Sequence, residues 1–163
     1  MALDIFLKVD GIKGESTDAQ HREEIELASF SWGASQQGSV HTGGGAGAGR
    51  ASFQDLLVVM NVSQAGPQLF LACAKGQHIR EVILTCRRAT GRDRRDFLRY
   101  TLSDVVVSSY QASGHASDDS APAEQISLTY GQFKVEYWPQ KAEGSQAAPV
   151  TAGWDLGSNR PPG

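Results

Sequence analysis

Alternation of apolar and polar residues with a period of two runs along most of this chain, and in two long segments it changes phase. Within residues 22–35 the apolar positions pass from odd to even numbers between Leu27 and Phe30. Within residues 124–138 they pass from even to odd numbers across Gly131. Because a shift of one residue sends every later side chain to the opposite face of a strand, each change predicts a β-bulge or a sharp bend. Long strands that bend in this way suit a closed barrel or two packed sheets.

The rest of the pattern predicts an all-β domain with one short helix. Further strands are expected at residues 3–9, 52–62, 79–88 and 97–111. Phe6 is an exception to the alternation in the first of them. Only residues 67–75 have a helical pattern, with Pro67 in the first turn and Gly76 just past the end. About six strands and one helix indicate a β-barrel of two packed antiparallel sheets that carries a short α-helix.

Length and composition indicate one domain with an ordinary core. The chain has 163 residues, of which 40% are apolar and 20% are charged, and this balance excludes the disordered and fibrous classes. We expect a single domain over residues 1–163, with an extended loop at about 38–50. From about residue 141, where Gly, Pro, Ala and Ser become frequent, we expect an extended tail held only at Trp154. The formal net charge of −3 gives no overall attraction to nucleic acid or to an anionic membrane.

The N-terminal segment indicates a cytoplasmic origin, and the reducing cytoplasm favours free thiols at the two cysteines. Residues 1–16 lack a basic region followed by an apolar stretch, so no cleaved signal peptide is expected. No window approaches the roughly 18 apolar residues of a transmembrane helix, so no membrane insertion is expected. Any export must use a route without a cleaved signal. Cys73 lies in the helical pattern and Cys86 ends a strand pattern, so both are predicted to be free, buried thiols.

A glycine-rich loop lies between two predicted strands. Six glycines fall between Gly38 and Gly49, and glycine loses more conformational freedom on folding than any other residue, so we expect a partner outside the domain to order this loop. Residues 44–51 come close to the phosphate-binding pattern G-x-x-x-x-G-K-[ST], but Arg50 replaces the lysine and Ala51 replaces the hydroxyl. A strand, not a helix, is predicted to follow. An interface loop is therefore favoured, and a nucleotide-binding enzyme is the remote alternative.

An arginine-rich hairpin is the second candidate site. Its arginines flank a predicted turn at residues 89–92, and they are Arg87, Arg88, Arg92, Arg94, Arg95 and Arg99. Few aromatic residues lie nearby to stack on bases and two aspartates interrupt the run, so no nucleic acid partner is expected. The alternatives are a solvated hairpin tip and one side of a protein contact. The acidic residues available for the other side are Asp118, Asp119 and Glu124.

Catalytic constellations are scarce. The histidines lie in four different segments without the spacing of metal ligands, at His21, His41, His78 and His115. The sequence Ser113-Gly114-His115 lacks the strand, turn and helix that a nucleophilic serine requires. Glu23 and Glu24 are adjacent, so on a strand they would point to opposite faces. We therefore expect no catalytic residue, no metal site, no cofactor and no enzyme activity.

Ordered blocks along almost the whole chain resemble one known family. The blocks are DIFLKVDGIKGES (4–16), HREEIELASFSWGASQ (21–36), the glycine loop, SFQDL (52–56), GPQLFLACAKGQHI (66–79), VILTCRRATG (82–91), VVVSSY (105–110), VEYWPQKAEG (135–144) and GWD (153–155). In this order they are similar to the haemolysin-coregulated protein (Hcp) family. Hcp is the tube protein of the bacterial type VI secretion system and is related in fold to phage tail tubes. One departure is the hairpin at residues 90–96, which is unusually rich in arginine.

The resemblance implies a phage tail-tube-like protomer, homohexameric rings with a central pore, and stacking of the rings into a tube inside a contractile sheath. It also implies a spike partner of the VgrG type, small effectors carried in the pore, and secretion of the protein itself by the type VI route. The glycine loop matches the family segment that reaches a neighbouring subunit or ring. The expected interface residues are Val40, His41, Thr42, Gly43, Gly44, Gly45, Gly47, Gly49 and Arg50. A stand-alone carrier or chaperone ring for effectors is the alternative.

Overall fold

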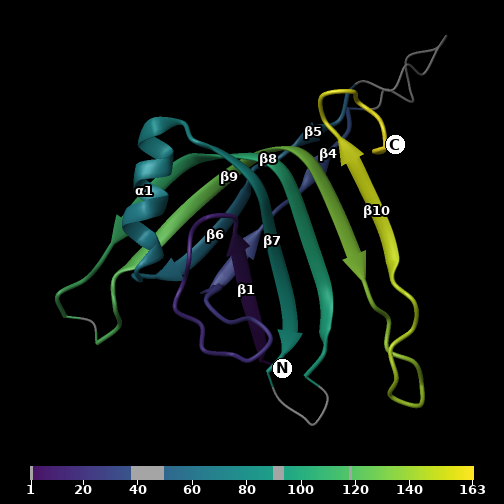
Figure 1. The fold of residues 1–163 in the computed structure, drawn as a ribbon, viewed down its shortest axis with the longest axis horizontal. Coiled ribbons are helices and arrows are strands. Elements are labelled where there is room, and N and C mark those ends of the chain that lie inside the picture. Colours follow the sequence, from purple (N-terminus) through teal and green to yellow (C-terminus); the bar gives the residue numbers. More distant parts are fainter. Residues whose placement is uncertain (1, 38–49, 90–93, 118) are drawn as a thin grey trace.

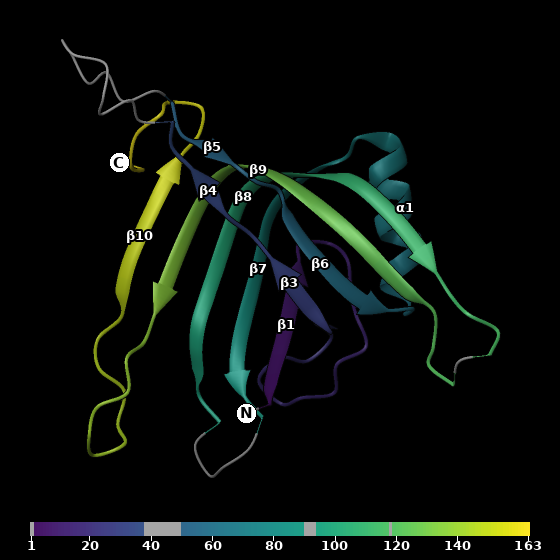
Figure 2. The same cartoon turned by 180° about the vertical axis from the view of Figure 1, so that it is seen from behind.

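Eight strands form one antiparallel sheet that curls around a core (Figures 1 and 2). The structure is a computed structural model and describes residues 2–37, 50–89, 94–117 and 119–163. The strands of the sheet are β1 (Leu3–Val9), β2 (Ile25–Glu26), β3 (Ser29–Ser31), β6 (Leu56–Asn61), β7 (His78–Arg88), β8 (Asp96–Ser113), β9 (Ala123–Tyr137) and β10 (Val150–Asp155). Their order is β2-β1-β7-β8-β9-β6-β3, and β10 also pairs with β9. The mainly β class is confirmed, with one continuous curled sheet in place of two separate ones.

The first change of phase lies where the sheet closes on itself. The strand expected at residues 22–35 is divided into short strands, of which β2 pairs with β1 and β3 pairs with β6. The Leu27 N–H donates to the Ile5 carbonyl (2.9 Å), and the Ala28 N–H donates to the Val59 carbonyl (2.7 Å). Two neighbouring residues thus bond to β1 and to β6, which are the second strands from the two ends of the sheet order. The change of partner accounts for the change of phase.

The second change of phase is a bend that β8 and β9 make together, where they arch over in Figure 1. Leu102 is buried before the bend and Val105 after it, so the buried positions change parity at Asp104. Asp104 has a φ of +55°, a conformation that aspartate tolerates better than most residues. A Cβ on the facing Gly131 would lie 3.1 Å from the Asp104 Cβ. The predicted sharp bend is therefore confirmed, and glycine allows the two strands to approach closely there.

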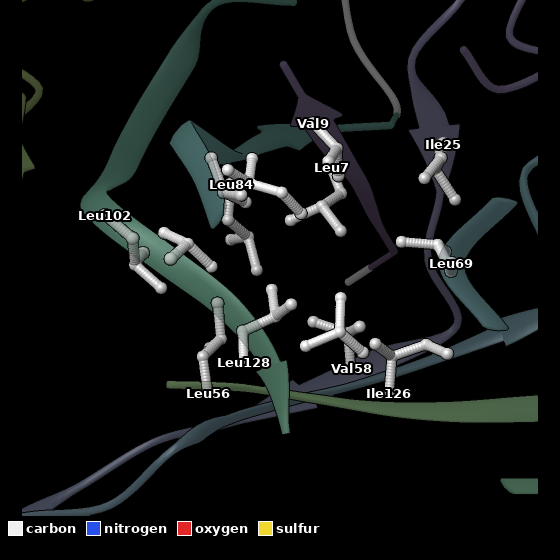
Figure 3. Close-up of a cluster of buried hydrophobic side chains, with 14 of the residues drawn as sticks. Leu7, Val9, Ile25, Leu56, Val58, Leu69, Leu84, Leu102, Ile126 and Leu128 are labelled. Atoms are coloured by element: carbon white, nitrogen blue, oxygen red, sulfur yellow. The ribbon is translucent and has the colours of Figure 1, made fainter. Parts of the chain in front are cut away.

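Helix α1 (Ala65–Lys75) covers one side of the curled sheet (Figure 1). It begins two residues before the predicted start, and Gly76 ends it in the left-handed conformation with a φ of 62°. Leu69 points from the helix into the core, where it faces side chains from several strands (Figure 3). The fully buried leucines at the centre include Leu84 of β7 and Leu128 of β9.

Both cysteines are free thiols, as predicted, but they differ in burial. Cys86 is buried on β7, and desolvation together with the nearby Asp96 charge raises its pKa to about 11. Cys73 on α1 is only half-buried. Because the thiolate is the reactive form, we expect Cys73 to react with a thiol reagent at pH 8 and Cys86 to react only after unfolding. Thiol titration with and without denaturant measures this, and equal rates in the native protein would contradict the burial of Cys86.

Strand β10 is an element that the sequence did not predict. Residues Val150 to Asp155 pair with β9 at six consecutive positions, so the expectation of a tail held only at Trp154 is wrong. The strand contains small residues and few β-branched ones, and its first residues are exposed. Backbone hydrogen bonds to β9 can hold such an edge strand without the alternating burial that a sequence pattern detects.

Candidate subunit interface

The glycine loop starts and ends on a ribbon of two short strands, β4 (Ala34–Ser35) and β5 (Ser52–Phe53). The two strands pair with each other at two positions, and in the described structure the ribbon pairs with no other strand. Of the predicted interface residues, those from Val40 to Gly49 lie outside the described residues, and Arg50 can be placed. A two-stranded ribbon of this size is not stable alone, so its position depends on side-chain contacts.

An aromatic cluster attaches the first side of the ribbon to the sheet. Trp32, just before β4, stacks on Phe133 of β9 with ring centroids 3.9 Å apart and planes 1° from parallel. The Trp32 indole N–H donates to the hydroxyl of Tyr130, and this hydroxyl donates to the Gln54 carbonyl at 2.7 Å. Burial of the hydroxyl raises the pKa of Tyr130. The cluster therefore connects Trp32, just before β4, and Gln54, just after β5, to β9.

The C-terminal end of β10 contacts the second side of the ribbon. Phe53 of β5 stacks on Trp154, with centroids 6.5 Å apart. Arg50 is exposed, and its Nη2 donates to the Leu156 carbonyl at 3.1 Å. The Leu156 N–H in turn donates to the Gly131 carbonyl at 2.9 Å. Arg50 thus contacts its own chain next to the point where the glycine loop leaves the ribbon.

The segment after the glycine loop has the wrong form for a phosphate site. Strand β5 begins at Ser52, two residues after Arg50. A phosphate-binding loop leads directly into a helix, whose N-terminal N–H groups face the phosphate. This observation agrees with the sequence-based argument against nucleotide binding.

Three arginines of the described part of the β7–β8 hairpin have separate surroundings. Arg87 is buried among carboxylates. The guanidinium of Arg88 lies over the Phe97 ring (5.8 Å), and that of Arg99 lies over the Trp138 ring (5.1 Å). Arg92 lies outside the described residues. Each of the two aromatic rings thus has one face covered by a cation, which does not favour stacking on bases.

Glu124 cannot serve as the acidic partner that the sequence suggested for this hairpin. It is 2% exposed on β9 and accepts a hydrogen bond from the Tyr110 hydroxyl. This hydrogen bond, with desolvation, raises the pKa of Tyr110 to about 12. The assignment of Glu124 to a surface contact is therefore wrong, because its carboxylate is buried beside α1. Asp119 is exposed, and Asp118 is not among the residues that the structure describes.

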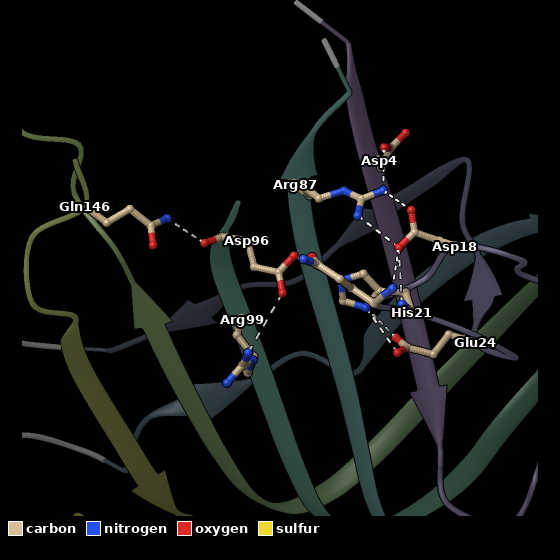
Figure 4. Close-up of polar contacts among 9 residues, drawn as sticks. Asp4, Asp18, His21, Glu24, Arg87, Asp96, Arg99 and Gln146 are labelled. Atoms are coloured by element: carbon tan, nitrogen blue, oxygen red, sulfur yellow. Dashed lines mark hydrogen bonds and ion pairs between the residues drawn. The ribbon is translucent and has the colours of Figure 1, made fainter. Parts of the chain in front are cut away.

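A buried ion-pair cluster surrounds Arg87 (Figure 4), and the sequence did not predict it. The Arg87 side chain is 5% exposed and donates to both oxygens of Asp18 (3.0 and 2.6 Å) and to Asp4 (3.2 Å). Its hydrogen bond holds the pKa of Asp18 well below the usual range. The guanidinium also lies 5.0 Å from the centre of the Phe6 ring. Phe6 is thus buried on the face opposite the core, which explains its break in the alternation.

His21 extends this cluster (Figure 4). Its ring stacks on Phe6 with centroids 4.3 Å apart. Its Nδ1 lies 3.1 Å from Glu24, and its Nε2 lies 3.0 Å from Asp96 at the start of β8. The ion pairs of Arg87 and the contacts of His21 hold the connection between β1 and β2 against the sheet.

His78 and His115, the other histidines that the structure describes, lie apart from each other. His78 pairs with Asp104 at 3.1 Å on the surface, His115 is exposed, and His41 lies in the part that is not described. Within the described residues, no group of three or more His, Cys, Asp or Glu side chains could hold a metal ion. In the same residues no helix has the length and apolar character needed to cross a membrane.

Large apolar side chains remain exposed in separate regions of the surface. Phe70 and Leu71 lie on the outer side of α1, with exposed fractions of 55% and 47%. Tyr137 and Val150 are exposed where β9 and β10 begin to pair. The second edge of β10 pairs with no strand of the described chain. Open strand edges and exposed apolar groups are typical of surfaces that contact other protein chains.

Comparison with known proteins gives the family. The family described as "Type VI secretion system effector, Hcp" matches residues 6–137 of this chain. The chain belongs to the Hcp family. The prediction from the ordered sequence blocks is thereby confirmed.

The similarity to individual Hcp proteins extends over the whole chain. Protein hcp1 of Pseudomonas aeruginosa is 41% identical over 160 residues, which cover 98% of each chain. A solved structure of a type six secretion system protein has a TM-score of 0.92 at 32% identity, covering 99% of this chain and 100% of the other. Hcp1 from Salmonella typhimurium has a TM-score of 0.82 at 36% identity with the same coverage.

Proposed function

We propose that this Hcp chain is the tube subunit of a type VI secretion system, in which six copies form a ring around a central pore and rings stack into the inner tube. Membership of the family makes the chain a component of that system. The observation that carries the proposal is the whole-length match, because it covers nearly all of this chain and of each relative compared. The tube itself is secreted.

The glycine loop is assigned to the contact between subunits or rings. Its residues in this role are Val40 to Gly49 together with Arg50. Support comes from the ribbon, whose base is fixed by Trp32 and Phe53 on one side of the molecule. A fixed base defines where the loop leaves the domain, and its glycines permit close approach of the two backbones.

The proposed partners follow from the tube role. A contractile sheath surrounds the tube, a VgrG-type spike protein lies at its tip, and small effectors occupy the pore. Before firing the protein is in the cytoplasm, and it leaves by the type VI route without a cleaved signal peptide.

The subunit is proposed to have no catalytic role. The strand after Arg50 and the missing hydroxyl at Ala51 both argue against a nucleotide site. Purified rings are therefore expected neither to bind ATP nor to hydrolyse it. Saturable ATP binding that disappears in Arg50→Ala would favour the enzyme instead.

Disulfide crosslinking tests the stacking of rings. Cys73 and Cys86 are first replaced with serine and alanine, and one cysteine is then placed in the Gly43–Gly49 loop and another on the hairpin end, at the exposed Arg94. Oxidation is expected to give ladders of covalently linked rings that reductant removes. Chains with only one of the two cysteines are the control and should stop at dimers. Absence of a ladder from every loop and rim pair tried would contradict the tube.

A further inference from the structure

A turn of defined shape near the C-terminus is here called the C-terminal support (Trp154–Arg160). The backbone groups of Asp155 and Arg160 bond to each other at 2.8 and 3.3 Å and close the turn. The Asp155 carboxylate accepts hydrogen bonds from the N–H groups of Ser158 (3.2 Å) and Gly157 (2.9 Å), which lower its pKa. The turn is therefore held by several hydrogen bonds of its own.

The C-terminal support is anchored to the sheet on one side and contacts the ribbon on the other. On the sheet side β10 pairs with β9, and the Gln132 side chain donates to Asp155 at 3.1 Å. On the ribbon side Trp154 packs on Phe53, and Leu156 accepts the hydrogen bond from Arg50. Figure 2 shows the ribbon of β4 and β5 beside the end of β10. The support thus connects β9 to the strand that follows the glycine loop.

The ribbon needs such a connection because its own pairing is short. β4 and β5 share two residue pairs, and pairing of this length does not hold its orientation in water. Trp32 holds the β4 side through the stack on Phe133. Without Arg50 and Phe53 in contact with the support, the β5 side would keep the hydrogen bonds of Gln54, the short pairing with β4 and the tilted ring contact of Phe53 with Trp32 at 6.5 Å.

We propose that the C-terminal support positions the ribbon that carries the glycine loop, with Arg50 and Trp154 as the two contacts that set the direction of β5. The inference rests on the proposed tube function. It adds that Arg50 contributes to assembly by its hydrogen bond to Leu156 of the same chain. Both residues are positioning residues, because their contacts are with β5 and Leu156.

The chemistry of Trp154 supports a packing role. Its indole N–H is buried and has no acceptor in the described structure, so the ring contact with Phe53 and not a hydrogen bond explains an aromatic side chain here. Trp154→Phe keeps a ring at this place and should preserve the position of the ribbon. Trp154→Ala removes the ring and should not.

Hydrogen exchange of the amides in residues 33–35 and 52–54 tests the positioning directly. Arg50→Ala and Trp154→Ala are each expected to raise exchange there by roughly tenfold, with β7 and β8 unchanged, because only local opening becomes easier. Arg50→Lys and Trp154→Phe should remain close to the wild type. Arg160→Ala is the matched control, since it removes the same charge from an exposed side chain and keeps the Arg160 backbone groups that close the turn. Unchanged exchange in the ribbon, or an equal rise over the whole sheet, would overturn the inference.

Ring formation of the same variants gives the functional readout. The concentration for half-maximal ring formation, measured by light scattering, should rise roughly tenfold for Arg50→Ala and Trp154→Ala and stay unchanged for Arg160→Ala. A loosened ribbon with rings that form at the wild-type concentration would overturn the role in assembly. Failure of the wild-type chain to form rings would instead reject the proposed tube function, and hydrogen exchange would still decide whether the support positions the ribbon.

Discussion

Replacing Asp18 with asparagine is expected to destabilise the fold by about 3 kcal/mol, at the low end of the cost of breaking a buried ion pair. The variant leaves the buried guanidinium of Arg87 with Asp4 as its remaining carboxylate. Asp4 is also the more exposed of the two partners, so it compensates the buried charge only in part. Urea unfolding at one fixed protein concentration measures the loss, because assembly makes stability depend on concentration.

The loss should depend on pH in a defined direction. The pKa of Asp18 is lowered in the folded state, chiefly by its hydrogen bond with Arg87. Its stabilisation is therefore fully present above the unfolded pKa of about 4 and declines as the pH falls toward the folded pKa. The difference between the wild type and Asp18→Asn should shrink below about pH 4.

The exposed pair of Asp10 and Arg80 gives a matched control on the same two segments. Its side chains are 46% and 80% exposed and lie 3.2 Å apart. Asp10→Asn should cost at most about 1 kcal/mol, since surface ion pairs contribute little. Equal losses for Asp18→Asn and Asp10→Asn, or a loss at Asp18 that does not change with pH, would contradict the structural role of the Arg87 cluster.

Replacing Gly44 and Gly45 together with valine is expected to abolish ring formation at micromolar concentration. β-Branched residues are strained by about 1–3 kcal/mol each where the backbone adopts a sparsely populated conformation, and such a cost is repeated at each of the six contacts of a ring. The barrel should stay folded, because the two glycines lie outside the alternating core. Native mass measurements report assembly, and far-ultraviolet circular dichroism and thermal unfolding report the fold.

Gly114→Val controls for the substitution itself. Gly114 is exposed in the β8–β9 connection, and a Cβ there would make ordinary contacts with Pro122 at 3.5 Å or more. This variant should assemble as the wild type does. Equal loss of assembly and thermal stability in the Gly44/Gly45 variant would show that the loop is part of the fold and not of the contact.

The sequence predicted those elements that have a clear alternation of apolar and polar residues or a clear residue at the helix end. Strand β1 has the predicted bounds, and α1 ends at Lys75 before Gly76, as expected. The two changes of phase also marked real events, a change of partner at Ala28 and a bend at Gly131. These features are local, because each depends on a few neighbouring residues.

The parts that the sequence could not predict depend on partners far away in the chain. The sequence pattern places Arg87 in a basic hairpin, but Arg87 is buried because the chain before β2 brings Asp18 to it, 69 residues away. The sequence pattern predicts a surface charge at Glu124, but its carboxylate is buried and accepts a hydrogen bond from Tyr110. Strand β10 forms because its backbone pairs with β9, and its own sequence lacks an alternating pattern. The apolar side chain of Phe6, which breaks the alternation of β1, is the one local feature that indicates the Arg87 cluster.

The native mass of the purified chain tests the central claim most directly. Native mass spectrometry over micromolar concentrations is expected to show a closed hexamer of about 105 kDa, six times the 17.5 kDa of one chain. The hexamer should persist with chelator and with reductant, because apolar and backbone contacts and not metal or disulfides are proposed to hold it. A monomer at every concentration would contradict the account.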